Sequence, residues 1–384
     1  MLNLDFTPEQ EMLREMVRGV LGQVSPLETV RELEDDPVGY SPELWARLAE
    51  LDLLGLVLPE EYGGSGMTMI EGVVVYEELG RALAPTPHFV SCVLSAGALL
   101  RSGSDAQKDQ WLRSVASGDA ILTPAWVEPD NGFGPLGVQV RAVSSGDGFT
   151  ITGAKRHVVF ASSADRLVVL ARTGDDVTDV DLFLVDPAAP GVTLTQQMSI
   201  SSDTQYRVDF DGVAVTEADR IGGAGTGWAT WESVMVDGMI LAAAQANGGC
   251  DHALEITVQY SKDREQFDKP LGAFQALAHD MADARTSLDG SKVLNYEAAW
   301  AHGARKPEVA KLAAMSKLFA ANSYRDTTAM AQQIFGGVGF TLEYEIQLYF
   351  RRAKQLQISW NDARRCEELV AAAVLGAVIG AVPA

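Results

Sequence analysis

The spacing of hydrophobic residues changes twice along the 384-residue chain, and this change restricts the folds open to it. Up to about Asp119, apolar residues recur every three or four positions, which is typical of helices that bury one face. From there to Gly223, short segments such as 138–143 and 206–210 alternate between polar and apolar residues, which is typical of strands. The helical spacing then returns and holds to the end of the chain. The sequence therefore predicts the order α, β, α.

We expect an α+β protein with three domains, because each change of spacing marks a change of architecture. These are an N-terminal α-helical domain at 1–119, a β-barrel or β-sandwich domain of antiparallel strands at 120–224, and a C-terminal α-helical bundle domain at 225–384. Two helix starts carry local signals. Thr7 precedes Pro8 and has Gln10 three residues on, which predicts a capping box, and Ser41 precedes Pro42.

The chain is strongly acidic, with 52 acidic and 30 basic side chains and a net charge of −22. Such a charge repels phosphodiester backbones and anionic lipid headgroups, so we expect neither nucleic acid nor a membrane as a partner. The cysteines, Cys92, Cys250 and Cys366, are too few for a disulfide framework and fit a reducing cytosol. The apolar stretch 369–384 is shorter than the roughly 20 residues of a membrane span. We interpret it as a buried or subunit-facing helix, expect no signal peptide, and expect a cytoplasmic protein.

The motifs of common hydrolases and nucleotide-binding folds are missing, namely GxSxG, HExxH, the Walker loop and a GxGxxG after a strand. The five histidines never occur at the spacing of metal ligands. His279 beside Asp280 is interpreted as a helix-surface pair. We therefore expect no metal site.

Two segments contain residues suited to a dinucleotide. The first, 260–271, contains Arg264, whose guanidinium offers a planar pair of donors to a pyrophosphate, and Phe267, which can pack against a ring. The second, 333–354, begins with a glycine-rich turn that lets a ligand approach the backbone. Taken alone, the two segments fit a plainer interpretation equally well, as a charged helix end and a glycine-rich helix stop.

In this order, and on a chain of this type, the two segments resemble those of the acyl-CoA dehydrogenase family. Pro-Glu-Glu-Tyr-Gly-Gly at 59–64 and Val-Glu-Pro at 127–129, where the family usually has Thr-Glu-Pro, extend the resemblance over essentially the whole chain. The resemblance implies helical N-terminal, antiparallel β middle and four-helix-bundle C-terminal domains. It also implies that FAD oxidises the Cα–Cβ bond of an acyl-CoA thioester while a carboxylate removes the α proton. Electron-transfer flavoprotein would be the acceptor.

The family's catalytic glutamate is missing from both positions at which the family places it. The commoner position lies six residues beyond the Lys of an Arg-Asp-Ala-Lys motif; counted from Lys354, it is occupied by Trp360. The rarer position aligns with Gly238, and the arginine that usually follows is Met239. Neither Trp360 nor Gly238 can accept a proton.

The flavin-ring side departs from the family as well. The family's Lys-x-Trp-x-Thr pattern becomes Lys155-Arg156-His157-Val158-Val159, so the indole and the hydroxyl beside the flavin are replaced by His157 and Val159. The Gly-Ser after Glu-Pro becomes Gly132-Phe133, which puts a bulky ring where a hydroxyl is usual. We expect Lys155 and Arg156 at a solvated strand edge, with binding of CoA phosphates as the alternative.

The residues that the family offers to the adenosine and pyrophosphate of FAD, across a dimer interface, are retained. They are Arg264, Gln266, Phe267, Gln275, Gln333, Gly336 and Gly337. This combination resembles the base-lacking subunit of actinobacterial heterotetrameric (α2β2) acyl-CoA dehydrogenases, whose partner supplies the glutamate. The resemblance implies an FAD shared with a catalytic partner subunit, and an acyl-CoA bound mainly by that partner. The acyl group in such enzymes is often a steroid side chain or another bulky acid.

Three alternatives stay open. The chain can be a self-sufficient homotetrameric dehydrogenase with a relocated base, Asp237 or Asp362, although a one-residue shift turns a helical side chain by about 100°. It can be a redox-inactive binding or scaffold protein on the same fold. It can also use the fold for other flavin chemistry that needs no strong base.

Overall fold

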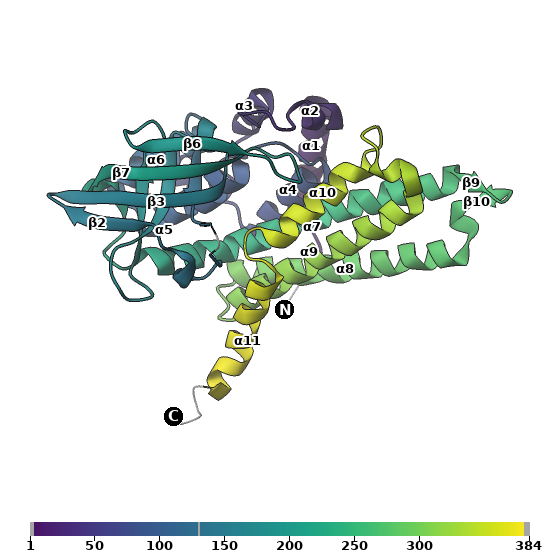
Figure 1. Cartoon of the computed structure of the whole chain (residues 1–384). Helices are drawn as coiled ribbons and strands as arrows, with labels where there is room; N and C mark the ends of the chain where they lie inside the picture. Colours follow the sequence, from purple (N-terminus) through teal and green to yellow (C-terminus); the bar gives the residue numbers. More distant parts are fainter. Residues whose placement is uncertain (1–3, 130, 380–384) are drawn as a thin grey trace. The chain divides into compact units, whose positions relative to one another are not determined.

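The computed structural model describes residues 4–129 and 131–379 and confirms the α+β class in the expected order (Figure 1). The first helices are α1 Pro8–Val24, α2 Leu27–Glu32, α3 Pro42–Glu50, α4 Met69–Arg81, α5 Ala96–Ser102 and α6 Asp105–Ser117, with a π-helix at Phe89–Ser95 before α5. The last are α7 Gly227–Asp263, α8 Gln275–Gly303, α9 Val309–Phe335, α10 Ile346–Ile358 and α11 Ala363–Ile379.

Both predicted helix starts are confirmed. The Thr7 hydroxyl accepts a hydrogen bond from the Gln10 amide at 3.3 Å, and the Gln10 side chain accepts one from the Thr7 amide at 2.9 Å. The Ser41 hydroxyl accepts from the Leu44 amide at 3.1 Å. These contacts satisfy amide groups that have no partner inside the helix.

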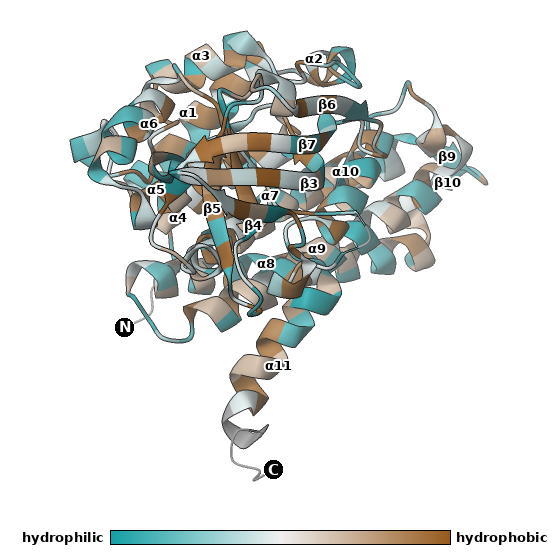
Figure 2. Cartoon of the chain, turned by 60° about the vertical axis from the view of Figure 1, so that its left-hand side comes forward, coloured by the Kyte–Doolittle hydropathy of each residue, from teal (hydrophilic) through white to brown (hydrophobic). Residues whose placement is uncertain are grey.

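The middle of the chain forms one sheet with the strand order β6-β7-β3-β2-β4-β5-β8, and β1 pairs with β4. Its strands are β1 Leu122–Ala125, β2 Arg141–Ser145, β3 Gly148–Val159, β4 Arg166–Arg172, β5 Val180–Val185, β6 Val192–Gln197, β7 Gln205–Thr216 and β8 Arg220–Ile221. Most pairs are antiparallel as expected, but β1 runs parallel to β4, and β2 and β4 share one parallel pair. Hydrophobic residues run along β3, β4 and β7 (Figure 2), and they form one buried cluster.

The strand expected at 138–143 begins only at Arg141. A 3-10 turn at Pro135–Gly137 precedes it, and the amides of Gln139 and Val140 donate to the carboxylate of Glu128 rather than to a neighbouring strand. A side chain has therefore replaced part of the backbone ladder, which alternation of hydrophobic residues cannot reveal.

The chain packs into two compact units. One takes Met1–Val30, Thr68–Ala84 and Met239–Ala384, and the other takes Arg31–Met67 and Pro85–Gly238. The three domain boundaries expected from the sequence stay a prediction, because the two units group residues that contact one another and do not show where each domain begins or ends.

In the first unit, α4 and α7 approach each other backbone to backbone at two glycines. A Cβ on Gly80 would lie 2.0 Å from the Gln245 carbonyl oxygen, and one on Gly248 would lie 1.8 Å from the Glu77 carbonyl oxygen. No side chain fits either place, so this contact requires glycine.

The helix α11 belongs to the same unit, and its C-terminal half extends away from the other helices (Figure 1). Residues 371–376 are exposed, including Val374 and Leu375. For these residues the expected burial within the chain is wrong, because no helix of this unit covers them. The subunit-facing alternative stays a prediction, and residues 380–384 lie outside the described part.

We expect Gly248→Ala to destabilise the fold by about 3 kcal/mol or more, because the methyl group must push α4 and α7 apart. Chemical denaturation measures the change. Gly19→Ala is the control: this α1 position has nothing within 4 Å, so the substitution should stabilise by about 0.5–1 kcal/mol. Equal effects of the two substitutions would contradict the tight helix contact.

Candidate functional site

The structure brings the two dinucleotide-like segments together through an aromatic contact. Tyr260, one turn before Arg264, stacks on Phe335 with ring centroids 4.1 Å apart and planes at 15°. Tyr344 meets both rings edge-on. The end of α7 that leads to Arg264 is thereby fixed beside the turn that begins at Gly336.

The first segment forms a hairpin of β9 Glu265–Gln266 and β10 Lys269–Pro270 that projects from the end of α7 (Figure 1). Its two turn residues, Phe267 and Asp268, have φ angles of 56° and 59°. Glycine and asparagine usually take such positions, and a bulky residue there is strained. Phe267 is also 86% exposed, so packing within this unit does not explain its position.

The other adenosine-side residues are also at the surface. Arg264, Gln266, Gln275, Gln333 and Gly337 are exposed, and Gly336 is partly exposed. Gly336 adopts φ 65°, ψ −141°, a conformation essentially restricted to glycine. No atom lies within 4 Å of a Cβ built on Gly336 or Gly337, so the backbone is open to a ligand. These residues fit the phosphate and adenosine half of a dinucleotide.

Trp360 lies in a tight bend between α10 and α11. Trp360 and Asn361 have φ angles of 56° and 69°, and the buried Asn361 amide contacts the Met239 sulfur at 3.5 Å. The bend therefore contacts the first residue of α7 after Gly238. Neither the bend nor α7 offers a carboxylate at the expected position.

The bend is held by a buried lysine that sequence reasoning missed. Lys317 on α9 is 1% exposed and donates to the Leu356 carbonyl at 2.6 Å and to the Asn361 carbonyl at 3.4 Å. Burial lowers the pKa of Lys317 to about 8. No sequence signal marks it, because its partners are backbone carbonyls.

Gly238 is buried, and the space beside it is filled. A Cβ at this position would lie 2.8 Å from Leu94 Cδ2 and 3.6 Å from Phe89 Cζ. Both side chains come from the π-helix at 89–95. There is no room for a glutamate without moving Leu94.

The two residues considered as a relocated base, Asp237 and Asp362, each have another partner. Asp237 pairs with Arg101 at 2.8 Å and is 13% exposed. Asp362 caps α11, accepting from the Arg365 amide at 2.8 Å. Both carboxylates therefore have structural contacts, which the sequence did not indicate.

In the β unit, the glutamate of the Val-Glu-Pro motif is a buried anchor. Glu128 is 4% exposed, and Lys155 donates to its carboxylate at 2.6 Å. The expectation of a solvated strand edge is wrong for Lys155, which is completely buried because its partner lies inside. Burial lowers the pKa of Lys155 to about 8, against the opposing effect of Glu128. Arg156 is partly buried, and its Nε has no partner among the described residues.

Aromatic and aliphatic side chains surround this anchor. Trp126 contacts Phe133 and Trp231, with ring centroids 5.4 and 5.1 Å apart. Val159 is 9% exposed. Phe133 is thus part of an aromatic cluster, whereas the serine that is usual at this position in the family would present a hydroxyl group.

His157 lies in a bulge between β3 and β7, with φ 53°. Its side chain is exposed, and its Nδ1 lies 2.8 Å from the Gln205 amide oxygen. Its backbone amide donates to Gln197 at 3.0 Å. These contacts hold the ring at the strand surface, in agreement with a structural role.

Within the described ranges no group of three or more His, Cys, Asp or Glu residues could hold a metal ion. Over the same ranges, no helix is both long and apolar enough to cross a membrane.

We expect Glu128→Gln to lower the free energy of unfolding by about 3–5 kcal/mol, because it leaves the Lys155 ammonium buried without a counter-charge. Asp186→Asn is the matched control in the same unit. It removes the half-exposed pair with Arg166, at 3.4 Å, and should cost no more than about 1 kcal/mol. Denaturant titration of both variants measures the difference, and comparable losses would contradict the anchoring role.

Stability should also depend on pH above neutrality. The folded pKa of Lys317, about 8, lies below its ordinary value of 10.5, so between these values the unfolded chain binds more protons. Stability therefore rises with pH across this window, and Lys155 adds to the rise. We expect a smaller rise in Lys317→Met, measured by denaturation at pH 8 and pH 10; an unchanged slope would show that Lys317 is not buried as described.

Comparison with known proteins agrees with this architecture. The N-terminal domain model of the acyl-CoA dehydrogenases matches residues 7–119, the middle domain model 123–213, and the C-terminal domain model 225–359. Probable acyl-CoA dehydrogenase YngJ of Bacillus subtilis is 32% identical over 366 residues, which cover 93% of this chain and 95% of YngJ.

Two solved structures have similar folds. The ChsE4-ChsE5 complex from Mycobacterium tuberculosis matches with a TM-score of 0.87 and 29% identity over 100% of both chains. A variant of the Tcur3481-Tcur3483 steroid ACAD matches with a TM-score of 0.86 and 29% identity, covering 97% of this chain and 99% of that one. The chain belongs to the acyl-CoA dehydrogenase family.

Proposed function

We propose that this chain is the base-lacking subunit of a heteromeric, FAD-dependent acyl-CoA dehydrogenase, and that it supplies the adenosine and pyrophosphate side of a flavin site shared with a catalytic partner. One observation carries the proposal. The strained, 86% exposed Phe267 and its neighbours are presented outward, while the space for a base at Gly238 is filled by Leu94.

The residues of the hairpin and the glycine-rich turn suit the polar half of the cofactor. Arg264 would bind the pyrophosphate with its guanidinium, and Gln333 would donate or accept at the ribose or adenine. Gly336 and Gly337 would let the backbone approach the ligand, and Phe267 would pack against its apolar faces. When bound, FAD accepts the hydride that leaves Cβ of the acyl thioester.

The ring half of FAD does not fit this chain. Val127, Val159 and Phe133 offer no side-chain donor, and Phe133 already packs on Trp126. His157 is turned to the surface and bound to Gln205. The isoalloxazine that these adenosine-side residues serve would therefore be held mainly by the partner subunit.

The partner would also supply the glutamate that removes the α proton. Trp360 and Gly238 cannot do so, and Asp237 and Asp362 are held by Arg101 and by the start of α11. The alternative of a self-sufficient enzyme would require one of these contacts to break before catalysis, which makes it the weaker hypothesis.

One neighbour, the complex of ChsE4 with ChsE5, supports a heteromeric assembly, and another, named as a steroid ACAD, supports a bulky substrate. We extend this to the present chain as a partner acyl-CoA dehydrogenase subunit and a bulky acyl-CoA, such as one with a steroid side chain. Electron-transfer flavoprotein would be the acceptor, and the complex would act in the cytoplasm.

The test is the flavin content of the chain alone and of the chain co-expressed with an acyl-CoA dehydrogenase subunit from the same organism that carries the glutamate. We expect colourless protein alone and FAD in the complex. In that complex Arg264→Ala should weaken FAD binding about ten- to a hundredfold, because a charged hydrogen-bond donor is lost.

Arg47→Ala is the matched control, since Arg47 is exposed on α3 and pairs only locally with Glu50. Its complex should retain flavin. A homotetramer of this chain that binds FAD and reduces it with an acyl-CoA would overturn the proposal, and loss of that activity in Asp237→Asn or Asp362→Asn would identify the relocated base.

A further inference from the structure

A pocket of about 180 Å³ opens on the surface of the first unit, where four helices meet. It is lined by side chains of α1, α4, α7 and α10 and by the bend between α1 and α2. This volume is below the roughly 300–1,000 Å³ of pockets for drug-sized ligands, so it suits only a small molecule. None of the pocket residues is among the seven that we assign to the adenosine side of FAD.

Three nitrogen-bearing side chains line this pocket, and each of them is open to solvent. Arg18, Arg81 and His252 have side chains that are 53%, 22% and 23% exposed. A ligand from outside can therefore reach all three. We call the site the Arg81 pocket.

The carboxylates beside the two arginines leave several hydrogen-bond donors unused. Arg18 donates from Nε and Nη2 to the two oxygens of Glu78, both at 2.8 Å, and Arg81 donates from Nη2 to Glu255. Among the described residues, Nη1 of Arg18 and both Nε and Nη1 of Arg81 have no partner. A guanidinium carries five N–H donors, so each arginine can still bind an acceptor from outside. Glu78, by contrast, is buried and has both oxygens occupied.

His252 becomes a third donor when its ring is protonated. Its Nδ1 lies 3.1 Å from the Glu255 carboxylate, which can only accept, so Nδ1 carries the hydrogen and the neutral ring presents Nε2 as an acceptor. Burial lowers the pKa of His252 and Arg81 on α4 lowers it further, while Glu255 on α7 and Glu345 on α10 oppose this. A bound anion would add a second negative charge beside the ring and would favour its protonated form.

The ring of Tyr349 holds these groups in place. It meets the His252 imidazole edge-on, with centroids 5.3 Å apart, and its hydroxyl donates to the Arg81 carbonyl at 2.7 Å. Apolar side chains complete the lining, namely Leu21, Pro26 and Leu27. The pocket therefore combines an apolar wall with unused donors, which suits a molecule that has one apolar and one anionic end.

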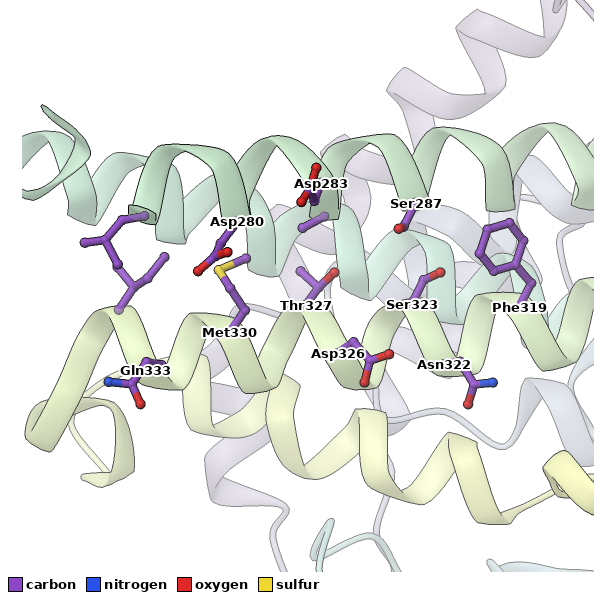
Figure 3. A pocket seen from close by; sticks show the side chains of 13 residues that line it. Asp280, Asp283, Ser287, Phe319, Asn322, Ser323, Asp326, Thr327, Met330 and Gln333 are labelled. Atoms are coloured by element: carbon purple, nitrogen blue, oxygen red, sulfur yellow. The ribbon is translucent and has the colours of Figure 1, made fainter. Parts of the chain in front are cut away.

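A larger groove of the same unit, between α8 and α9, has the opposite chemistry (Figure 3). Asp280, Asp283 and Asp326 line it, and among the described residues that do so there is no Lys, Arg or His. The chain as a whole has a net charge of −22. An anion is therefore repelled from the α8–α9 groove, whereas the Arg81 pocket offers it cationic donors.

We propose that the Arg81 pocket binds a small aliphatic carboxylate through unused donors of Arg18 and Arg81 and through Nε2 of the protonated His252 ring. The alkyl chain would lie against Leu21 and Leu27. Guanidinium groups bind carboxylates with two parallel hydrogen bonds, and the apolar wall favours an alkyl chain over a wholly polar anion such as phosphate. This site goes beyond the proposed function and does not depend on it.

The first experiment measures binding of sodium butyrate to the full-length chain by saturation-transfer difference NMR at constant ionic strength. We expect a dissociation constant on the order of 1 mM, because so small a ligand makes few contacts. Butylammonium, which has the same alkyl chain and the opposite charge, should not bind. The proposal fails if butyrate shows no saturable binding, or if inorganic phosphate competes for the site more strongly than unlabelled butyrate does.

A side chain added at Gly22 tests the location without removing a charge. Gly22 lines the pocket and a Cβ built there has nothing within 4 Å, so a leucine fits the fold and occupies the pocket. Gly19→Leu is the matched control, because Gly19 lies three residues earlier on α1, has equally open space at its Cβ and does not line the pocket.

We expect Gly22→Leu to weaken butyrate binding about tenfold or more, and Gly19→Leu to leave it unchanged. Both variants should be at least as stable as the wild type, since leucine is a better helix former than glycine. Equal affinities of the two variants would overturn the location of the site.

The pH dependence distinguishes a contact with His252 from a merely structural role of this residue. Only the protonated ring donates from Nε2, so the affinity for butyrate should rise as the pH falls through the pKa of His252, which lies below its ordinary value of 6.5. In His252→Gln the affinity should be lower and should not change over this range. A wild-type affinity that is independent of pH would overturn the proposed contact. These measurements need no flavin, so their outcome leaves the proposed function to its own test.

Discussion

The buried ion pair between Glu128 and Lys155 is the contact on which the local shape of the β unit depends. The Glu128 carboxylate accepts hydrogen bonds from the Gln139 and Val140 amides as well as from the lysine, so it joins β3 to the segment before β2. The same lysine donates to the carbonyl of Trp126 at 3.3 Å, and the Trp126 ring packs on Phe133, so the aromatic cluster lies beside the pair. Removing a carboxylate from water costs free energy, and a buried carboxylate persists only where several hydrogen-bond donors compensate that cost.

The two groups of residues that correspond to the two halves of the family's flavin site have different surroundings in this chain. The half that faces outward, at the Arg264 hairpin and the Gly336 turn, keeps an exposed aromatic ring, an exposed guanidinium and an open backbone. The half that would serve the chain's own flavin ring is packed with Phe133 and Val159. The first group is therefore open at the surface, whereas the second is packed against side chains of its own chain.

The sequence predicted much of the fold because hydrophobic spacing and local caps, such as Thr7 with Gln10, act over a few residues. The absence of a glutamate at Trp360 and Gly238 follows from their positions in the sequence, and that the chain therefore lacks a base stays a prediction. The sequence did not predict that Lys155 is buried or that Lys317 holds the Trp360 bend. Those facts depend on partners many residues away, and the partners of Lys317 are carbonyls that every residue has.

The filled space at Gly238 has a consequence for any substitution at this position. A mutation that returned a glutamate there would meet Leu94 at 2.8 Å, and a smaller residue at 94 would first leave a cavity. Each single step is therefore unfavourable, although the pair together is not forbidden. The packing therefore couples positions 94 and 238, so that a glutamate and the space for it would have to be introduced together.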